Sequence, residues 1–192
     1  MKNLKSYLLV LLVALMVMPV FNGCKKGEND PGFSLRTRDN RITAKWTLTK
    51  IEGTQTDVTV AGISVTTTRT TTYDGTTKIV TSTSSLGGSS TSTGTGTYVM
   101  EILQDGQMTW SETYTSGGSS ADVQTSSGTW EWLDSDNNKS VVLLDGGNHL
   151  FSGGIWRIDR LAHDELVVFD KGDSNDNGST SNWDYKYTFT VK

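Results

Sequence analysis

The sequence predicts an all-β protein in which about eight to ten antiparallel strands form an up-and-down meander that closes into a barrel. Thr, Ser and Gly dominate, whereas Ala and Leu are sparse and only 2 Pro occur in 192 residues, a bias typical of β-sheets. Apolar and polar residues alternate in several segments, which Asp-Gly and Gly-Gly pairs separate. No amphipathic helix lies between these segments, so a parallel sheet is excluded. Closure removes the open edges of the meander.

The first 23 residues are typical of a cleaved export signal. Lys2 and Lys5 precede an uninterrupted apolar run over residues 7–20, which is shorter than the roughly 20 residues of a membrane-spanning helix. The signal ends at a small residue directly before Cys24, the only cysteine in the sequence. This junction resembles the bacterial lipobox, which implies that Cys24 is acylated, for example with palmitate, and becomes the mature N-terminus. The alternative is an ordinary secretory signal with an incidental cysteine.

Residues 25–32 are polar, as expected of a lipidated tether at residues 24–33 that separates the lipid from one folded domain at residues 34–192. By analogy with Gram-negative lipoproteins, Lys25 in place of Asp permits transport to the outer membrane, where the domain faces either the periplasm or the outside. No second thiol is present for a disulfide or a thiolate metal site. The net charge of −4, without a Lys/Arg cluster after the tether, argues against a nucleic-acid partner.

The last strand is the clearest, because every second residue in it is large and apolar: Trp183, Tyr185, Tyr187, Phe189 and Val191. The same alternation marks four further segments: residues 98–102, 108–114, 130–132 and 156–158. Tight turns are expected at four pairs: Asp74-Gly75, Asp105-Gly106, Gly117-Gly118 and Asp145-Gly146. To close the barrel, the strand around Trp46 has to pair with the one around Tyr187.

Residues 66–96 depart from this pattern because they are almost entirely Thr, Ser and Gly and bury little apolar surface. We interpret them as a hairpin insertion that turns at Asp74-Gly75, projects beyond the barrel and ends in a flexible loop near residues 86–93. One reading of the insertion is a solvated segment with little order. The other is a surface arm that contacts a partner.

Residues 33–38 are suited to a short helical turn, and residues 44–51 follow as a first strand with a central Trp. With the strands at residues 128–132 and 156–168, this order resembles the lipocalin-like domain of many bacterial lipoproteins. Ala44 stands where that family has the Gly of its Gly-x-Trp motif. The resemblance implies a barrel that lodges a small apolar ligand. It implies no activity, because many bacterial members have no known ligand.

Nine large side chains are predicted to point into the barrel: Trp46, Tyr98, Met100, Trp110, Trp130, Trp132, Trp156, Tyr185 and Tyr187. A barrel of about eight strands is just wide enough to be filled by side chains or to hold one small ligand. As a pocket, these residues form an apolar, aromatic lining for a small hydrophobic molecule. As a packed core, they fill the interior by themselves.

A calcium site is possible where oxygen-bearing side chains alternate before a glycine. Asp173, Asn175 and Asn177 precede Gly178, and Asp184 falls at the twelfth position of such a loop. Acidic, Asn-rich turns are also common without metal, and no other cofactor is indicated.

Enzyme chemistry finds little support, so we expect no catalytic residues. His149 and His163 are not spaced with carboxylates as metal ligands, and no nucleophile or phosphate-loop motif occurs. The sequence therefore predicts a membrane-anchored, lipocalin-like lipoprotein that binds a small lipophilic ligand in its barrel. The alternative is a surface interaction module with a solid barrel, which binds a protein or glycan through its Thr/Ser-rich hairpin and loops.

Overall fold

The computed structural model describes residues 29–30, 36–60, 62–116, 122–133, 139, 141–145 and 154–191. These residues form one short helix and ten strands: α2 (Arg38–Ile42), β1 (Lys45–Val60), β2 (Ser64–Tyr73), β3 (Thr77–Ser84), β4 (Ser89–Ile102), β5 (Gln107–Ser116), β6 (Asp122–Trp132), β7 (Val141–Asp145), β8 (Gly154–Leu161), β9 (Glu165–Asp176) and β10 (Ser179–Val191). The all-β class predicted from composition and alternation is therefore confirmed.

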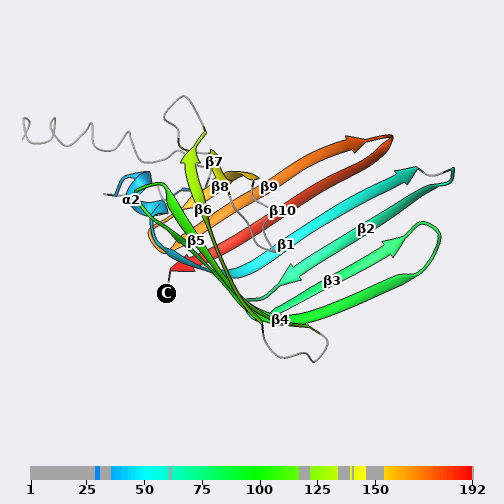
Figure 1. Cartoon of the computed structure of the whole chain (residues 1–192), viewed down its shortest axis with the longest axis horizontal. Coiled ribbons are helices and arrows are strands. Elements are labelled where there is room, and N and C mark those ends of the chain that lie inside the picture. Colours follow the sequence, from blue (N-terminus) through cyan, green and yellow to red (C-terminus); the bar gives the residue numbers. More distant parts are fainter. Residues whose placement is uncertain are drawn as a thin grey trace, which may run out of the picture.

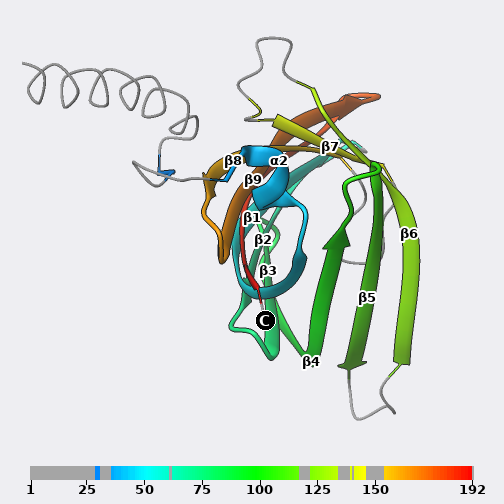
Figure 2. The ribbon, with the colours of Figure 1, turned by 90° about the vertical axis from the view of Figure 1, so that its left-hand side faces the viewer.

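The strands form a closed ring in which each pairs antiparallel with its neighbours in sequence, and β1 pairs with β10 (Figure 1). Ile51 of β1 lies opposite Tyr187 of β10, so the closure expected between these two strands is confirmed. β5 and β6 lie on the side of the ring opposite β1 and β9 (Figure 2). At one end of the ring β1 also pairs with β4, where Trp46 lies opposite Met100.

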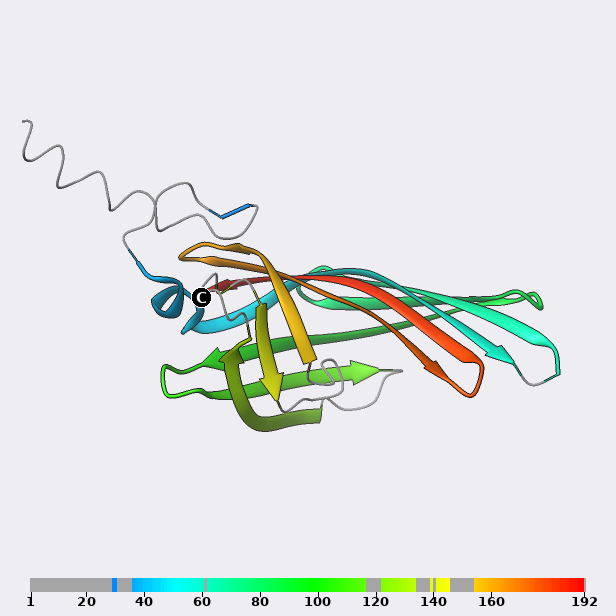
Figure 3. The ribbon, with the colours of Figure 1, turned by 90° about the horizontal axis from the view of Figure 1, so that it is seen from above.

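Three hairpins, β1–β2, β3–β4 and β9–β10, continue far beyond the rest of the ring (Figures 1 and 3). Their strands include the longest ones of the ring: β1 has 16 residues and β10 has 13, whereas β7 has 5. We call their outer parts the projecting sheet, which consists of residues 53–60, 64–71, 80–84, 89–93, 170–176 and 179–185.

The Thr/Ser-rich segment, residues 66–96, is built into the ring, and the direct pairing of β1 with β4 at residues 45–47 bypasses β2 and β3 at one end. The segment provides most of β2, all of β3 and the first half of β4. The flexible loop expected near residues 86–93 is wrong, because β4 begins at Ser89 and only residues 85–88 form the turn. Backbone hydrogen bonds to both neighbouring strands order this segment although it has few apolar side chains.

Two of the expected tight turns are confirmed. Gly75 and Gly106 lie between strands with φ of 98° and 82°, values that side chains with a Cβ rarely adopt. The pair Gly117-Gly118 lies outside the described residues. Asp145 is the last residue of β7, and Gly146 after it also lies outside them.

The core fills the ring at the end that α2 covers. Large side chains from β1, β4, β5 and β8 to β10 meet there and are almost wholly buried. The helix begins at Arg38 after the cap residue Thr37, later than the turn expected over residues 33–38, of which 33–35 lie outside the described residues. Trp46 is 0% exposed and donates from Nε1 to the Ile42 carbonyl at 2.7 Å, which fixes the helix over the core.

Asn29 and Asp30 are held against β8 at this same end. The Asn29 N–H donates to the Asp159 carbonyl at 3.1 Å, and the Leu161 N–H donates to Asp30 Oδ1 at 2.7 Å. Asp30 also forms an ion pair with Arg38, and both side chains are buried. The tether expected over residues 24–33 is therefore fixed to the domain at these two residues.

Candidate functional site

Most of the residues predicted to line a ligand cavity pack against one another as core. Six of the nine are buried: Trp46, Tyr98, Met100, Trp110, Trp156 and Tyr187. The other three, Trp130, Trp132 and Tyr185, are half-buried against the same cluster. The pattern of strand alternation therefore placed them on the correct face of the sheet.

The aromatic rings of the core are in direct contact. Trp156 stacks on Tyr187 with centroids 5.5 Å apart and meets the edge of Trp110 at 6.0 Å. Tyr185 continues this row beyond Tyr187, at a centroid distance of 6.1 Å. Such ring-to-ring contacts are typical of a protein interior that is filled by side chains.

Trp130 and Trp132 have structural partners for their indole N–H groups. Trp130 Nε1 donates to the Leu103 carbonyl at 2.7 Å, and Trp132 Nε1 donates to Asp39 Oδ1 at 2.7 Å. Their rings pack edge to face with centroids 5.8 Å apart. These two residues hold the turn after β4 and the helix α2 in place.

The residues of the expected calcium loop lie on a regular hairpin. Asp173 and Asn175 belong to β9, Asn177 lies in the turn, and Asp184 lies in β10. The structure does not bring Asp184 to the other three, since it lies opposite Lys171, whose Nζ is 2.7 Å from its carboxylate. Among the described residues, no group of three or more His, Cys, Asp or Glu side chains is placed to hold a metal ion.

A polar layer lies inside the ring next to the aromatic core. Glu112 is 5% exposed and lies opposite Tyr98. Burial lowers the pKa of Lys78, and the negative charge of Glu112 opposes this shift. Tyr73 donates from its hydroxyl to the Gly96 carbonyl at 2.8 Å. This layer marks the change from an apolar core to a polar inner face along the same strands.

The inner face continues from the core onto the projecting sheet in rows of directly opposed residues. The first row beyond the core joins Thr71, Gly53, Tyr185 and Asp170, and the second joins Arg69, Gln55, Trp183 and Gly172. The third joins Thr67, Asp57, Ser181 and Ser174. Directly opposed residues on paired strands share a face, so all three rows lie on the face that forms the core further down.

Two aromatic rings in these rows lie directly against glycines of the neighbouring strands. A Cβ added to Gly53 would lie 2.1 Å from Tyr185 Cδ1, and one added to Gly172 would lie 2.3 Å from Trp183 Cζ2. Each ring therefore occupies the space in which a side chain at the glycine would lie. Trp183 Nε1 donates to Asp170 Oδ1 at 2.8 Å, which fixes the orientation of its ring. Both residues are half-buried.

Beside these rings, Asp57 is the centre of a hydrogen-bond network. Ser181 Oγ donates to Asp57 Oδ1 at 2.6 Å, Gln55 Nε2 donates to it at 2.8 Å, and Arg69 pairs with Oδ2. Partial burial opposes ionisation of this carboxyl, but the two hydrogen bonds and the charge of Arg69 outweigh it and lower the pKa of Asp57.

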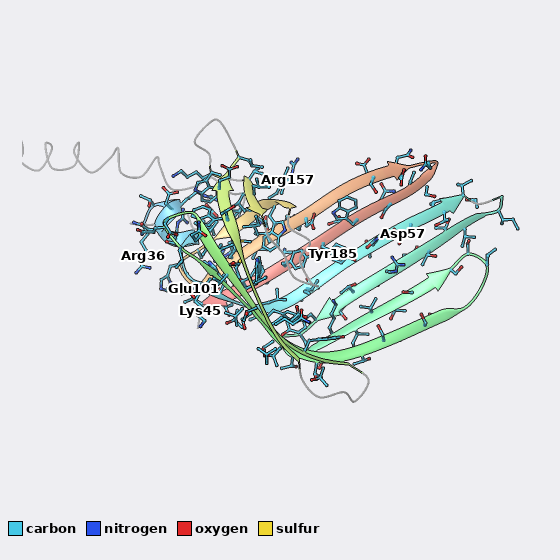
Figure 4. All side chains as sticks on the ribbon, viewed as in Figure 1. Arg36, Lys45, Asp57, Glu101, Arg157 and Tyr185 are labelled. Atoms are coloured by element: carbon cyan, nitrogen blue, oxygen red, sulfur yellow. The ribbon has the colours of Figure 1, made fainter. Side chains whose placement is uncertain are left out.

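We call this set the inner-face platform: Gln55, Asp57, Arg69, Ser181, Trp183 and Tyr185. Tyr185 and Asp57 are both labelled on the projecting sheet in Figure 4. Of the six, only Tyr185 was among the predicted site residues. For Trp183 the sequence signal is Gly172, an isolated Gly within a strand, which indicates close approach by a neighbour.

Two hollows lie on the outer face of the ring. One, of about 140 Å³, is lined by Lys45, Val99, Glu101, Thr109 and Ser111. The other, of about 350 Å³, lies beside Asn29 and contains the ion pairs Lys50–Glu52 and Arg160–Glu165. Both are open to solvent, and the charged groups of the larger one pair with each other.

Comparison with known proteins identifies no family. No family model matches the chain, and no curated protein matches it. One solved structure that the chain matches weakly is Ail, the attachment invasion locus protein of Yersinia pestis, in complex with the heparin analogue sucrose octasulfate. The two share 8% identity over 77% of this chain and 98% of that chain, with a TM-score of 0.21. Among the described residues, no helix is long and apolar enough to cross a membrane.

Proposed function

We propose that this protein is a lipid-anchored binding module of the bacterial outer membrane, in which a solid, lipocalin-like barrel carries the projecting sheet to its partner. Its ten strands are two more than the eight typical of lipocalins. The observation that carries the proposal is the division of the inner face. Near α2 it is filled by buried aromatic side chains, and on the projecting sheet it presents half-buried ones.

The packing of the core favours a binding surface over a lipid carrier. A carrier needs a concave apolar cavity of about 300 Å³ or more, and the side chains expected to line one contact each other instead. Binding through exposed strands also agrees with the absence of catalytic or cofactor-binding motifs in the sequence. The module therefore acts by recognition, with no chemical step.

The attachment of Asn29 supports the orientation of the module. The five residue steps from the proposed lipid on Cys24 to Asn29 span at most about 18 Å. Because Asn29 is fixed at the α2 end of the ring, that end stays near the membrane. The tips of the three long hairpins lie at the other end of the molecule (Figure 3), so the projecting sheet points away from the bilayer.

The test uses the full chain and its Cys24→Ala variant, expressed in a Gram-negative host. We expect the full chain in the outer-membrane fraction and the variant in the soluble fraction of the envelope. The purified variant, free of anchor and detergent, is then extracted with organic solvent. We expect no stoichiometric lipid in the extract, and an equimolar apolar molecule would show that the protein is a carrier. Retention of the variant in the membrane fraction would refute the lipid anchor at Cys24.

A further inference from the structure

We propose that the inner-face platform binds an uncharged oligosaccharide, with the pyranose rings lying on Trp183 and Tyr185. This inference rests on the proposed binding function and assigns it a site and a ligand class. It is carried by three features of the described residues: the orientation of the two rings, the polar network beside them and the local charge.

The two rings are oriented as surfaces on which a sugar can lie. In each, ring carbons lie directly against a glycine of a neighbouring strand, and the residue is half-buried, so part of the ring remains open to a ligand. A pyranose ring has a face of C–H groups that packs on aromatic carbon. Tyr185 and Trp183 are two residues apart on β10, about 7 Å along a strand, so a chain of two or more sugars is needed to contact both.

The glycines are required for this orientation. A Cβ at Gly53 or Gly172 would come within 2.3 Å of ring carbon, so any other residue would displace the rings from the sheet. The contact between Trp183 Nε1 and Asp170 further limits rotation of the larger ring. Rings held in place before binding lose less conformational entropy when a ligand arrives.

The polar side chains beside the rings suit hydroxyl groups. Gln55 lies directly opposite Trp183, and Ser181 lies next to it on the same face of β10. Amide and hydroxyl groups both donate and accept hydrogen bonds, as sugar hydroxyls do. Arg69, whose side chain is 44% exposed, pairs with Asp57 through one nitrogen and carries further donors on its guanidinium.

The charges of the platform favour an uncharged glycan over an acidic one. The Arg69 charge is balanced by Asp57, and Asp170 adds a second carboxylate beside Trp183. Carboxylates repel the sulfate and uronic-acid groups of an acidic glycan that lies against them. Binding of a neutral sugar is correspondingly insensitive to salt, since no counterions are exchanged.

The experiment measures calorimetric binding of the full chain in detergent to hexasaccharides of glucose, mannose, xylose and N-acetylglucosamine, with heparin as the acidic comparison. We expect at least one neutral hexasaccharide to bind at low and high salt, and heparin not to bind. Trp183→Ala and Tyr185→Ala should each weaken binding by about tenfold or more, as expected when an aromatic anchor is lost. Gln55→Ala tests the platform without removing a packed ring.

Asp184→Ala is the matched control, because Asp184 lies between the two rings in sequence and on the opposite face of β10; it should bind as the parent does. Loss of binding in the control, or full binding in Trp183→Ala and Gln55→Ala, overturns the site. Binding of heparin alone, or of no glycan in the panel, overturns the ligand class. These outcomes are separate from the lipid extraction, in which a stoichiometric apolar molecule would refute the binding module itself.

Discussion

Asp30 and Arg38 form an ion pair in which the two side chains are 0% and 3% exposed, eight residues apart in sequence. Asp30 also accepts the Leu161 N–H, so the pair joins the start of the domain to α2 and β8. Removing one partner of a buried pair leaves an uncompensated charge. We expect Asp30→Ala to lower the free energy of unfolding by about 3–5 kcal/mol, measured by urea denaturation in the Cys24→Ala background.

The control for this change is Lys50→Ala, which removes an ion pair with Glu52 in which both side chains are 54% exposed. Exposed pairs contribute about 0–1 kcal/mol. Equal costs for the two substitutions would mean that Asn29 and Asp30 are not held against the domain, and the orientation proposed from that contact would fail.

The contact of Tyr185 with Gly53 is testable by a double-mutant cycle. Gly53→Ala places a methyl group within 2.1 Å of the ring as it stands, so we expect a loss of about 1–3 kcal/mol from overpacking. In the Tyr185→Ala background the ring is absent, and Gly53→Ala should cost much less. Thermal and urea denaturation of the four proteins give the coupling energy, and a value near zero would refute the close contact.

Stability is expected to fall steeply in alkali because core tyrosines keep their protons in the folded state. Burial, with the charge of Asp74 added, raises the pKa of Tyr73 to about 12 from 10.0. Burial also raises the pKa of Tyr98 and Tyr187. The unfolded chain releases these protons near pH 10, so the stabilisation is fully present below that pH and is lost as pH rises further.

Between pH 10 and its raised folded-state pKa, each such tyrosine lowers the free energy of unfolding by about 1.4 kcal/mol per pH unit. Urea denaturation at a series of alkaline pH values measures the slope. The Tyr73→Phe variant should show a smaller slope, because the contribution of one tyrosine is missing. An unchanged slope in that variant would place the Tyr73 hydroxyl in contact with solvent.

Trp156 provides a direct test of the solid barrel. It is 3% exposed and contacts Trp110, Tyr187 and Phe189. Trp156→Ala should cost about 3–5 kcal/mol through the cavity it leaves. Because apolar cavities accept apolar molecules of matching shape, added indole should raise the melting temperature of the variant and leave the parent unchanged. Stabilisation of the parent by indole would show that its interior already holds a pocket.

Local patterns in the sequence predicted the fold because they depend on neighbouring residues only. The alternation around Tyr187 and the Asp-Gly pair at residue 105 specify a strand and a turn without reference to the rest of the chain. Composition was misleading for residues 66–96, because few side chains there mark a buried face. Their order comes from backbone pairing, which any Thr or Ser can make.

The platform was not predictable in the same way. Gly53 and Tyr185 become neighbours only through the register of β1 against β10, and a shift of one residue would place each on the other face. Sequence alternation identified Tyr185 as facing inward, but the position along the strand at which the core ends depends on how far β5 to β8 extend. The network of Asp57 with Arg69 and Ser181 likewise joins three strands.

The pairing of β1 with β10 determines when the molecule can finish folding. β2 covers one edge of β1 early, but the other edge stays open until β10, the last strand of the chain, pairs with it. Contacts of such high sequence separation form slowly, and during that interval the first strand exposes unpaired backbone groups to any other extended chain. A partly formed ring therefore stays open to mispairing with other extended chains until its final strand is in place.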